Sequence, residues 1–196
     1  HMNYKKQFED IGILSEEERN AIQYLVESFR FGKTIGSLLK LQPERFALAE
    51  KAVQKIEANG ISNVFNMEFM NKGLLSIKRL VQVAHALTDK YDVMITNPPY
   101  IGSSVMEDHV RDYASTFFPN SKTDMFAMFM ETDFLKQAGF RAIVNMHSWM
   151  FLPSYEKLRE SLQRNYTYIT MAHLGARAFA EIAGEVVQTT SFVVRY

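Results

Sequence analysis

The run Tyr91–Thr96 followed at once by Asn97-Pro98-Pro99-Tyr100 constrains the fold of this chain more than any other feature. The run is short and apolar, which predicts a buried strand. That strand must stop at the prolines, because proline cannot donate a hydrogen bond to a sheet and restricts the residue before it. Ligands of open α/β sheets bind at the carboxyl ends of strands, so these four residues are expected to form a stiff binding loop.

The chemistry of this loop suits a planar amino group. The side-chain oxygen of Asn97 and the carbonyl oxygen of Pro98 are two acceptors with restricted directions. Tyr100 adds a flat face for a planar ring. Such a geometry can hold an amino-bearing base for attack on a methyl donor, although a simple strand-ending turn would also account for the tetrapeptide taken alone.

The chain changes character near residue 90. Residues 1–90 are expected to be a helical insert or linker, starting with a capping box at Ser15 and Glu18 and carrying no recognisable chemistry. Residues 91–196 predict alternating helices and strands. The expected helices cover 15–31 (ended by Gly32), 43–58, 62–89, 124–138 (closed by Gly139) and 153–164, and the expected strands cover 91–96, 141–146, 166–174 and 186–195.

Composition excludes several classes of protein. The sequence has no Cys, which removes disulfides and thiolate metal ligands. It has no apolar run of about twenty residues and no recognisable signal peptide, which predicts a cytoplasmic protein without a membrane span. The histidines lack the spacing of metal ligands, so no metal is expected. A formal net charge of +0 means that DNA binding would need most phosphate contacts from elsewhere.

Four blocks downstream extend the pattern of the loop. They are Pro119–Phe129, Ala142–Trp149, Leu158–Leu162, and the pair His173–Phe179 with Val187–Arg195. Together with the loop they resemble, in order, motifs IV to VIII of the gamma-class adenine-specific DNA methyltransferases. The resemblance is strongest to type IIG restriction–modification enzymes and to the methyltransferases of BREX phage-defence systems. The segment Gly32–Leu38 resembles the insert before motif IV in that group.

This resemblance implies an α/β fold: the second half of a Rossmann-like sheet of an S-adenosylmethionine-dependent methyltransferase, with 91–196 as a partial catalytic domain. It implies that Asn97, Pro98, Pro99 and Tyr100 are catalytic. Tyr100 and Phe179 would stack on an adenine flipped out of double-stranded DNA, and Phe129 would pack on the cofactor. Asp124 is assigned to the cofactor or to orienting the loop, although a helix N-cap explains it as well, and Phe126 is assigned to the core. Defence-system proteins are possible partners.

One departure from the family pattern is as informative as the matches. The family's cofactor loop is glycine-rich and lies upstream, whereas this sequence contains no Gly-x-Gly at all. The chain is therefore expected to be a fragment that carries the target-base half of a site and binds S-adenosylmethionine weakly or not at all. Two alternatives stay open: a protein glutamine methyltransferase of the release-factor type, and a non-catalytic scaffold.

Overall fold

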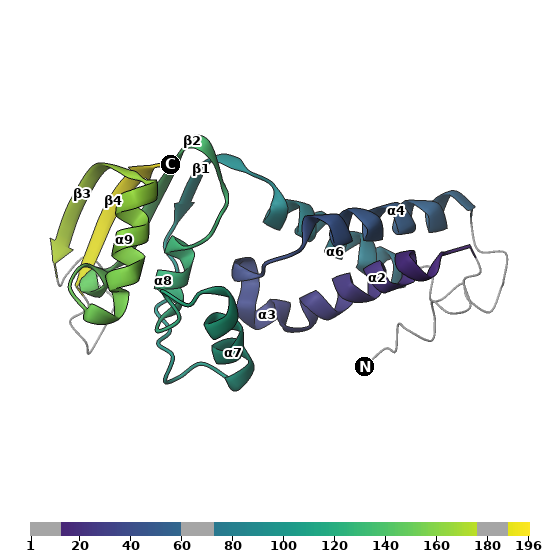
Figure 1. Ribbon diagram of the computed structural model, residues 1–196, viewed down its shortest axis with the longest axis horizontal. Helices are drawn as coiled ribbons and strands as arrows, with labels where there is room; N and C mark the ends of the chain where they lie inside the picture. Colours follow the sequence, from purple (N-terminus) through teal and green to yellow (C-terminus); the bar gives the residue numbers. More distant parts are fainter. Residues whose placement is uncertain (1–12, 60–72, 176–187) are drawn as a thin grey trace. The chain divides into compact units, whose positions relative to one another are not determined.

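The structure, a computed structural model, describes residues 13–59, 73–175 and 188–196, and the chain divides into two compact units, His1–Asp89 and Lys90–Tyr196 (Figure 1). The first unit is helical. Its long helices are α2 (Glu16–Ser28), α4 (Pro43–Asn59) and α6 (Leu75–Thr88), and three short turns join α2 to α4: η1 (Phe29–Phe31), α3 (Gly32–Ile35) and η2 (Gly36–Leu38).

The predicted capping box at the start of α2 is confirmed. The backbone N–H of Ser15 donates to the Glu18 carboxylate at 2.7 Å, and the N–H of Glu18 donates to the Ser15 hydroxyl at 3.2 Å. The apolar faces of α2, α4 and α6 meet in one core, which includes Ile22, Leu25, Phe46, Val53, Ile56, Ile77 and Ala84.

The prediction that the first helical run ends at Gly32 is wrong, because Gly32 begins the short helix α3. The chain turns at Gly36 instead, where φ is +59°, a conformation that glycine adopts without strain.

The second unit is built on a four-stranded sheet with the order β1-β2-β4-β3. Its strands are β1 (Tyr91–Thr96), β2 (Leu135–Met146), β3 (Thr167–Gly175) and β4 (Thr189–Arg195). β1 pairs parallel to β2, and β4 pairs antiparallel to both β2 and β3. This topology confirms the predicted α/β class, with parallel strands at 91–96 and 141–146 and an antiparallel last strand.

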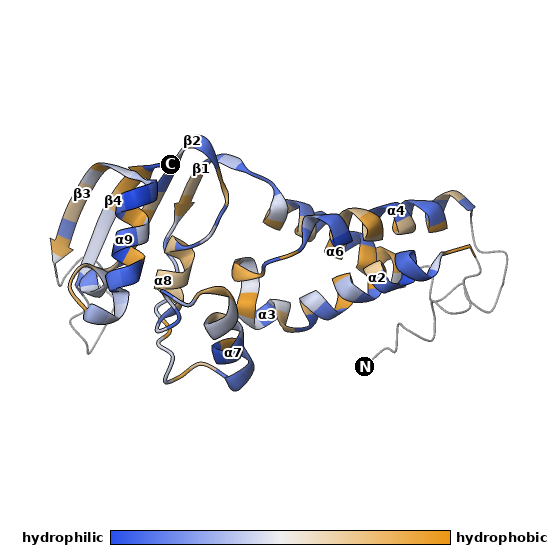
Figure 2. Cartoon of the chain, in the orientation of Figure 1, coloured by the Kyte–Doolittle hydropathy of each residue, from blue (hydrophilic) through white to orange (hydrophobic). Residues whose placement is uncertain are grey.

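One face of the sheet carries the core of this unit. Helices α8 (Met125–Met130) and α9 (Glu156–Asn165) pack there, and Figure 2 shows α8 hydrophobic along its length while α9 alternates between hydrophobic and hydrophilic residues. The core cluster contains Phe126, Met130, Ile143, Trp149, Tyr155, Leu158, Leu162, Phe192 and Val194. Burying each of the larger side chains stabilises the fold by about 1.5–3 kcal/mol, so this cluster fixes the helices against the strands.

A buried polar group ties the carboxyl end of β2 to its neighbours. The side-chain oxygen of Asn145 accepts hydrogen bonds from the indole N–H of Trp149 at 3.1 Å and from the hydroxyl of Thr190 at 3.0 Å. These bonds join β2, β4 and the turn η5 (His147–Met150). Because Asn145 is fully buried, its satisfied oxygen favours this one arrangement of the three segments.

The predicted helix over 124–138 is wrong, because α8 ends at Met130 and β2 already begins at Leu135. The reason is tertiary. The fully buried guanidinium of Arg141 donates to the carbonyl oxygens of Met130 and Thr132, which a continuing helix would have used for itself. The predicted closing residue, Gly139, therefore lies inside a strand.

Gly139 allows β1 and β2 to approach closely at an irregular point of their pairing. Tyr91 pairs with Leu135 and Val93 with Phe140, so the segment between them in β2 bulges outward. A Cβ at Gly139 would lie 2.9 Å from the carbonyl oxygen of Lys136 and 3.0 Å from that of Asp92. Only glycine fits this approach without displacing a backbone.

Two further features of this unit differ from expectation. Helix α7 (Asp108–Phe117) was not predicted; it is a mostly polar segment in which only Val110 and Ala114 are buried. β1 was predicted to be buried, yet Val93 is 55% and Ile95 79% exposed. Both side chains lie on the face of β1 opposite to Met94 and Thr96, which are half-buried.

Candidate active site

The loop Asn97–Tyr100 lies at the carboxyl end of β1, beside the carboxyl end of the parallel strand β2. Asn97 and Pro99 are exposed, Pro98 is buried, and Tyr100 is half-buried. The buried Pro98 anchors the loop, while the amide of Asn97 remains accessible to a ligand. Both prolines lack a backbone donor, so acceptor groups dominate what the loop presents.

The ring of Tyr100 rests on an aromatic cluster. It meets Phe126 edge to face, with ring centroids 6.0 Å apart and an interplanar angle of 82°, and Phe126 lies 5.9 Å from the ring of Tyr155. Such pairs stabilise by about 0.5–1.5 kcal/mol beyond the burial of area. Phe126 is only 1% exposed, which confirms the prediction that it is a core residue. Its support of Tyr100 was not predicted.

Asp124 joins the loop to α8. One of its carboxylate oxygens, Oδ1, accepts hydrogen bonds from the backbone N–H of Ile101 at 3.1 Å and of Phe126 at 3.2 Å. The bond to Phe126 makes Asp124 the N-cap of α8, as the sequence allowed. The backbone joins the two segments as well, because Met125 donates to Ile101 at 3.0 Å and Ser103 donates to Thr123 at 2.8 Å.

Burial changes the acidity of the groups around this loop. It raises the pKa of Asp124, although hydrogen bonds from the backbone of Phe126, Ile101 and Met125 oppose the change. The pKa of Tyr100 is raised by burial and by the negative charge of Asp124. Burial raises the pKa of Tyr155 too. Both phenols therefore stay neutral hydrogen-bond donors through the physiological range.

Of the two remaining candidate residues, the structure describes only Phe129. Phe129 is half-buried on α8, and its carbonyl oxygen accepts from the hydroxyl of Thr132 at 2.8 Å. Among the described residues, no hydrogen bond or ring contact joins Phe129 to the loop. Phe179 lies outside the described residues. The roles that the resemblance assigns to Phe129 and Phe179 therefore stay predictions.

The residues present fit a nucleoside cofactor only in part. Phe129 on α8 offers one half-buried ring, but a nucleoside also needs a backbone turn that approaches it closely, and the sequence has no Gly-x-Gly. Across residues 13–59, 73–175 and 188–196, no group of three or more His, Asp or Glu side chains is placed to hold a metal ion. In the same ranges, no helix is long and apolar enough to cross a membrane.

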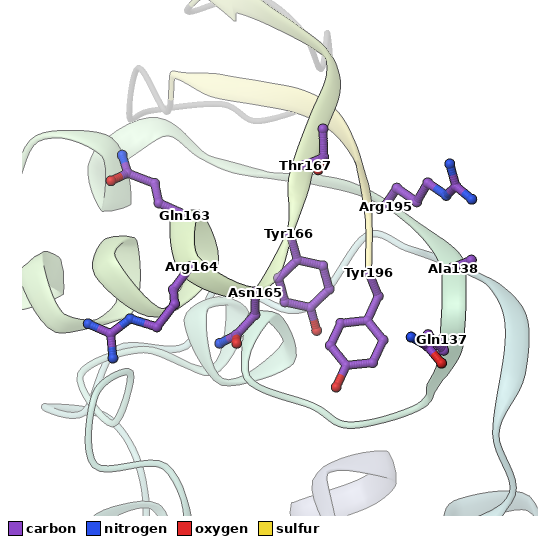
Figure 3. Close-up of a pocket in the computed structure, with 9 residues that line it drawn as sticks. All are labelled: Gln137, Ala138, Gln163, Arg164, Asn165, Tyr166, Thr167, Arg195 and Tyr196. Atoms are coloured by element: carbon purple, nitrogen blue, oxygen red, sulfur yellow. The ribbon is translucent and has the colours of Figure 1, made fainter.

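A cavity of about 390 Å³ lies at the opposite end of the strands from the loop (Figure 3). It is lined by Gln137, Ala138, Gln163, Arg164, Asn165, Tyr166, Thr167, Arg195 and Tyr196. These residues lie near the starts of β2 and β3, at the end of β4 and at the end of α9, whereas Asn97 follows the end of β1. Figure 3 also shows the guanidinium groups of Arg164 and Arg195 pointing away from the two tyrosine rings. The cavity is therefore separate from the loop.

Comparison with known proteins gives one family and two close relatives. Residues 17–179 match the family described as Eco57I restriction-modification methylase. The chain is 43% identical over 169 residues to a protein of Escherichia coli O9:H4 (strain HS) named adenine-specific methyltransferase BrxX. It is 40% identical over 171 residues to a protein of Lacticaseibacillus casei (strain Zhang) named adenine-specific methyltransferase PglX. Each alignment covers 85% of this chain but only 14% of the relative's length.

Among solved structures, a modification subunit of a putative type I restriction enzyme from Vibrio vulnificus YJ016 is similar with a TM-score of 0.44. The sequences are 16% identical, and the match covers 76% of this chain and 37% of that chain.

Proposed function

Because this chain belongs to the Eco57I restriction-modification methylase family, we propose that it forms the target-base half of the active site in a longer DNA methyltransferase. The reaction would transfer a methyl group to the exocyclic amino group of adenine. Both curated relatives carry the name adenine-specific methyltransferase, which supports this substrate. The cofactor of the longer protein would be S-adenosylmethionine.

The loop would hold the amino group through two acceptors. One amino proton would be donated to the side-chain oxygen of Asn97 and the other to the carbonyl oxygen of Pro98. Accepting both protons directs the nitrogen lone pair out of the plane of the base, toward the incoming methyl group. S-adenosylmethionine would supply that methyl group when bound, mainly by residues outside this chain. Within this chain, catalysis would come from positioning and fixed dipoles.

The ring of Tyr100 would carry the base itself. Taking a base out of the duplex costs a few kcal/mol, and stacking on an aromatic side chain returns about 1–3 kcal/mol per base. The edge-to-face contact of Tyr100 with Phe126 leaves the ring held in place before the base arrives. Phe179 is the second stacking residue that we propose.

The observation that carries this proposal is the exposed Asn97 amide on a proline-stiffened loop, at the carboxyl end of a strand that pairs parallel to its neighbour. That place is where open α/β sheets bind ligands. In the full-length protein, Asn97→Ala should abolish methyl transfer and leave the affinity for S-adenosylmethionine nearly unchanged. Tritiated methyl incorporation into DNA and calorimetric titration of the cofactor measure the two quantities.

Asn165→Ala is the matched control. Asn165 is an exposed asparagine at the end of α9 in the same unit, and its side-chain amide donates to the carbonyl oxygen of Ser161 at 2.9 Å. This variant should keep normal transfer. If Asn97→Ala kept near-normal transfer, or lost cofactor binding without a change in melting temperature, the assignment of Asn97 to the target amino group would be wrong.

A glutamine side chain also presents a planar amino group, so a protein substrate of the release-factor type is the alternative outcome of the same assay. Transfer to a glutamine-containing peptide and not to DNA would favour it.

The resemblance to phage-defence methyltransferases makes bacterial defence the setting that we propose. Double-stranded DNA with a flipped adenine and proteins of a defence system would then be the partners, in the cytoplasm.

A further inference from the structure

We propose that Asp124 is a positioning residue for the Asn97–Tyr100 loop, acting through the backbone N–H of Ile101, and not a ligand of the cofactor. This inference rests on the proposed function, because it assigns how the target-base loop is held in the geometry needed for methyl transfer. Asp124 touches neither Asn97 nor the proposed base. Its effect would pass through the peptide that follows Tyr100.

The loop has few groups by which the rest of the protein can hold it. Pro98 and Pro99 have no backbone N–H, so the next backbone donors after Asn97 are those of Tyr100 and Ile101. The Ile101 N–H donates to Oδ1 of Asp124 at 3.1 Å. This bond fixes the peptide plane between Tyr100 and Ile101, and with it the direction in which the Tyr100 ring leaves the backbone.

A helix N-cap needs only part of this arrangement. The bond from the Phe126 N–H to Asp124, at 3.2 Å, caps α8 and spans two residues. The bond from Ile101 spans 23 residues and contributes nothing to the cap. Both donors meet the same oxygen, so the start of α8 and the loop are held in one fixed relationship. Phe126 lies two residues after Asp124, and its ring packs edge to face against the ring of Tyr100.

The surroundings of the carboxylate favour this role over cofactor binding. Oδ1 already accepts two N–H groups, and Oδ2 faces Gly102, where an added Cβ would lie 3.7 Å from it. The segment around the loop is also joined by backbone bonds that do not involve the Asp124 side chain, from Met125 to Ile101 and from Ser103 to Thr123. Shortening the side chain should therefore loosen the loop without unfolding the unit.

Two substitutions separate the two bonds of Asp124: the bond from the Ile101 N–H, called the tether below, and the bond from the Phe126 N–H that caps α8. In Asp124→Ser the hydroxyl is a good N-cap for α8 but is too short to reach the Ile101 N–H as well. In Asp124→Asn the side-chain oxygen has the same reach as Oδ1 and only the charge is lost. Both variants should be made in the full-length protein, with Asn165→Ala as a control, and characterised by melting temperature, kcat, KM for S-adenosylmethionine and hydrogen exchange.

Asp124→Ser should melt within about 3 °C of the wild type, because the cap is kept. Its kcat should fall about 10- to 100-fold with an unchanged KM for S-adenosylmethionine, since a displaced reacting group loses rate and not cofactor affinity. The amides of residues 100–103 should exchange faster with solvent. Asp124→Asn should keep kcat within about threefold and keep normal exchange, because the acceptor is retained.

Three results would overturn the proposal. Unchanged exchange of residues 100–103 in Asp124→Ser would show that the carboxylate does not hold the loop. A raised KM for S-adenosylmethionine in both variants would return Asp124 to the cofactor site. A loss of kcat in Asp124→Asn equal to that in Asp124→Ser would mean that the charge matters and the tether does not. If the wild type transferred no methyl group, the proposed function would fail, yet the exchange measurement would still decide whether Asp124 holds the loop.

Discussion

The phenolic oxygen of Tyr100 lies 3.5 Å from the side-chain oxygen of Asn97, at the outer limit of a hydrogen bond. The hydroxyl of Tyr100 donates and the side-chain oxygen of Asn97 accepts in this contact, so this oxygen lies beside the edge of the Tyr100 ring. That oxygen is the acceptor that we assign to the amino group of the base. The long distance means that the bond is weak enough to be replaced by a ligand.

Tyr100 should therefore act mainly through its ring. In the full-length protein, Tyr100→Phe should lower kcat/KM by less than about tenfold, because only a weak bond to Asn97 is lost. Tyr100→Ala removes the stacking face and should lower kcat/KM about 5- to 150-fold, which corresponds to about 1–3 kcal/mol. Steady-state methylation of a duplex oligonucleotide measures both. Equal losses in the two variants would assign the main role to the hydroxyl.

The chain of residues 1–196 should bind S-adenosylmethionine weakly or not at all. Phe129 offers a single ring face, and the sequence lacks the Gly-x-Gly turn that would bring backbone close to the nucleotide. Isothermal titration of this chain, beside the full-length protein as a positive control, tests the expectation. Micromolar binding would mean that the described unit holds a cofactor site of a different kind.

Arg141 should be among the residues on which the stability of the α/β unit depends most. Its guanidinium is fully buried, lies 4.9 Å from the centre of the Tyr166 ring, and donates to two backbone carbonyls. Burial lowers its pKa, which reflects the cost of the buried charge. Arg141→Met removes that cost but leaves two carbonyl groups unpaired, at about 1–3 kcal/mol each. We expect a net loss of about 1–4 kcal/mol in the free energy of unfolding.

Urea unfolding measures this loss, and Arg164→Met is the control. Arg164 is exposed near the end of α9, and its replacement should change the free energy of unfolding by less than about 0.5 kcal/mol. Arg141→Lys should also destabilise, because an ammonium group cannot reproduce the planar fork that reaches both carbonyls. A variant Arg141→Met as stable as the wild type would show that the guanidinium is not what ends α8.

The helical unit should lose stability in acid through Glu18. The backbone N–H of Ser15, and secondarily Lys55, lower the pKa of Glu18 below its ordinary range. A carboxyl whose pKa is lowered by folding stabilises the folded state above its unfolded pKa. This contribution is lost as the pH falls through the folded pKa, which lies below the ordinary range of a glutamate. Thermal unfolding of wild type and Glu18→Gln between pH 3 and 7 should show a difference at neutral pH that shrinks in acid. A constant difference would contradict this linkage.

The sequence predicted best where a single residue type decides the local structure. The prolines after Thr96 set the end of β1 to the residue, and the capping box at Ser15 set the start of α2. Prediction failed where the deciding partner is distant in sequence. The end of α8 depends on Arg141, eleven residues beyond Met130, and the Asp124 tether spans 23 residues. Neither contact leaves a periodic signal, so neither could be found from the pattern of apolar residues.

The close approach of β1 and β2 at Gly139 predicts that mutations of this residue impair function although it lies outside the candidate site. A side chain there would push against the carbonyl oxygens of Lys136 and Asp92 and force β1 away from β2, although Gly139 lies at the end of β1 opposite to Asn97. Since a shift of about 1 Å in a reacting group can cost about a hundredfold in rate, a genetic screen for defective alleles should recover codon 139 alongside codon 97. Such alleles would encode folded protein with a misplaced loop.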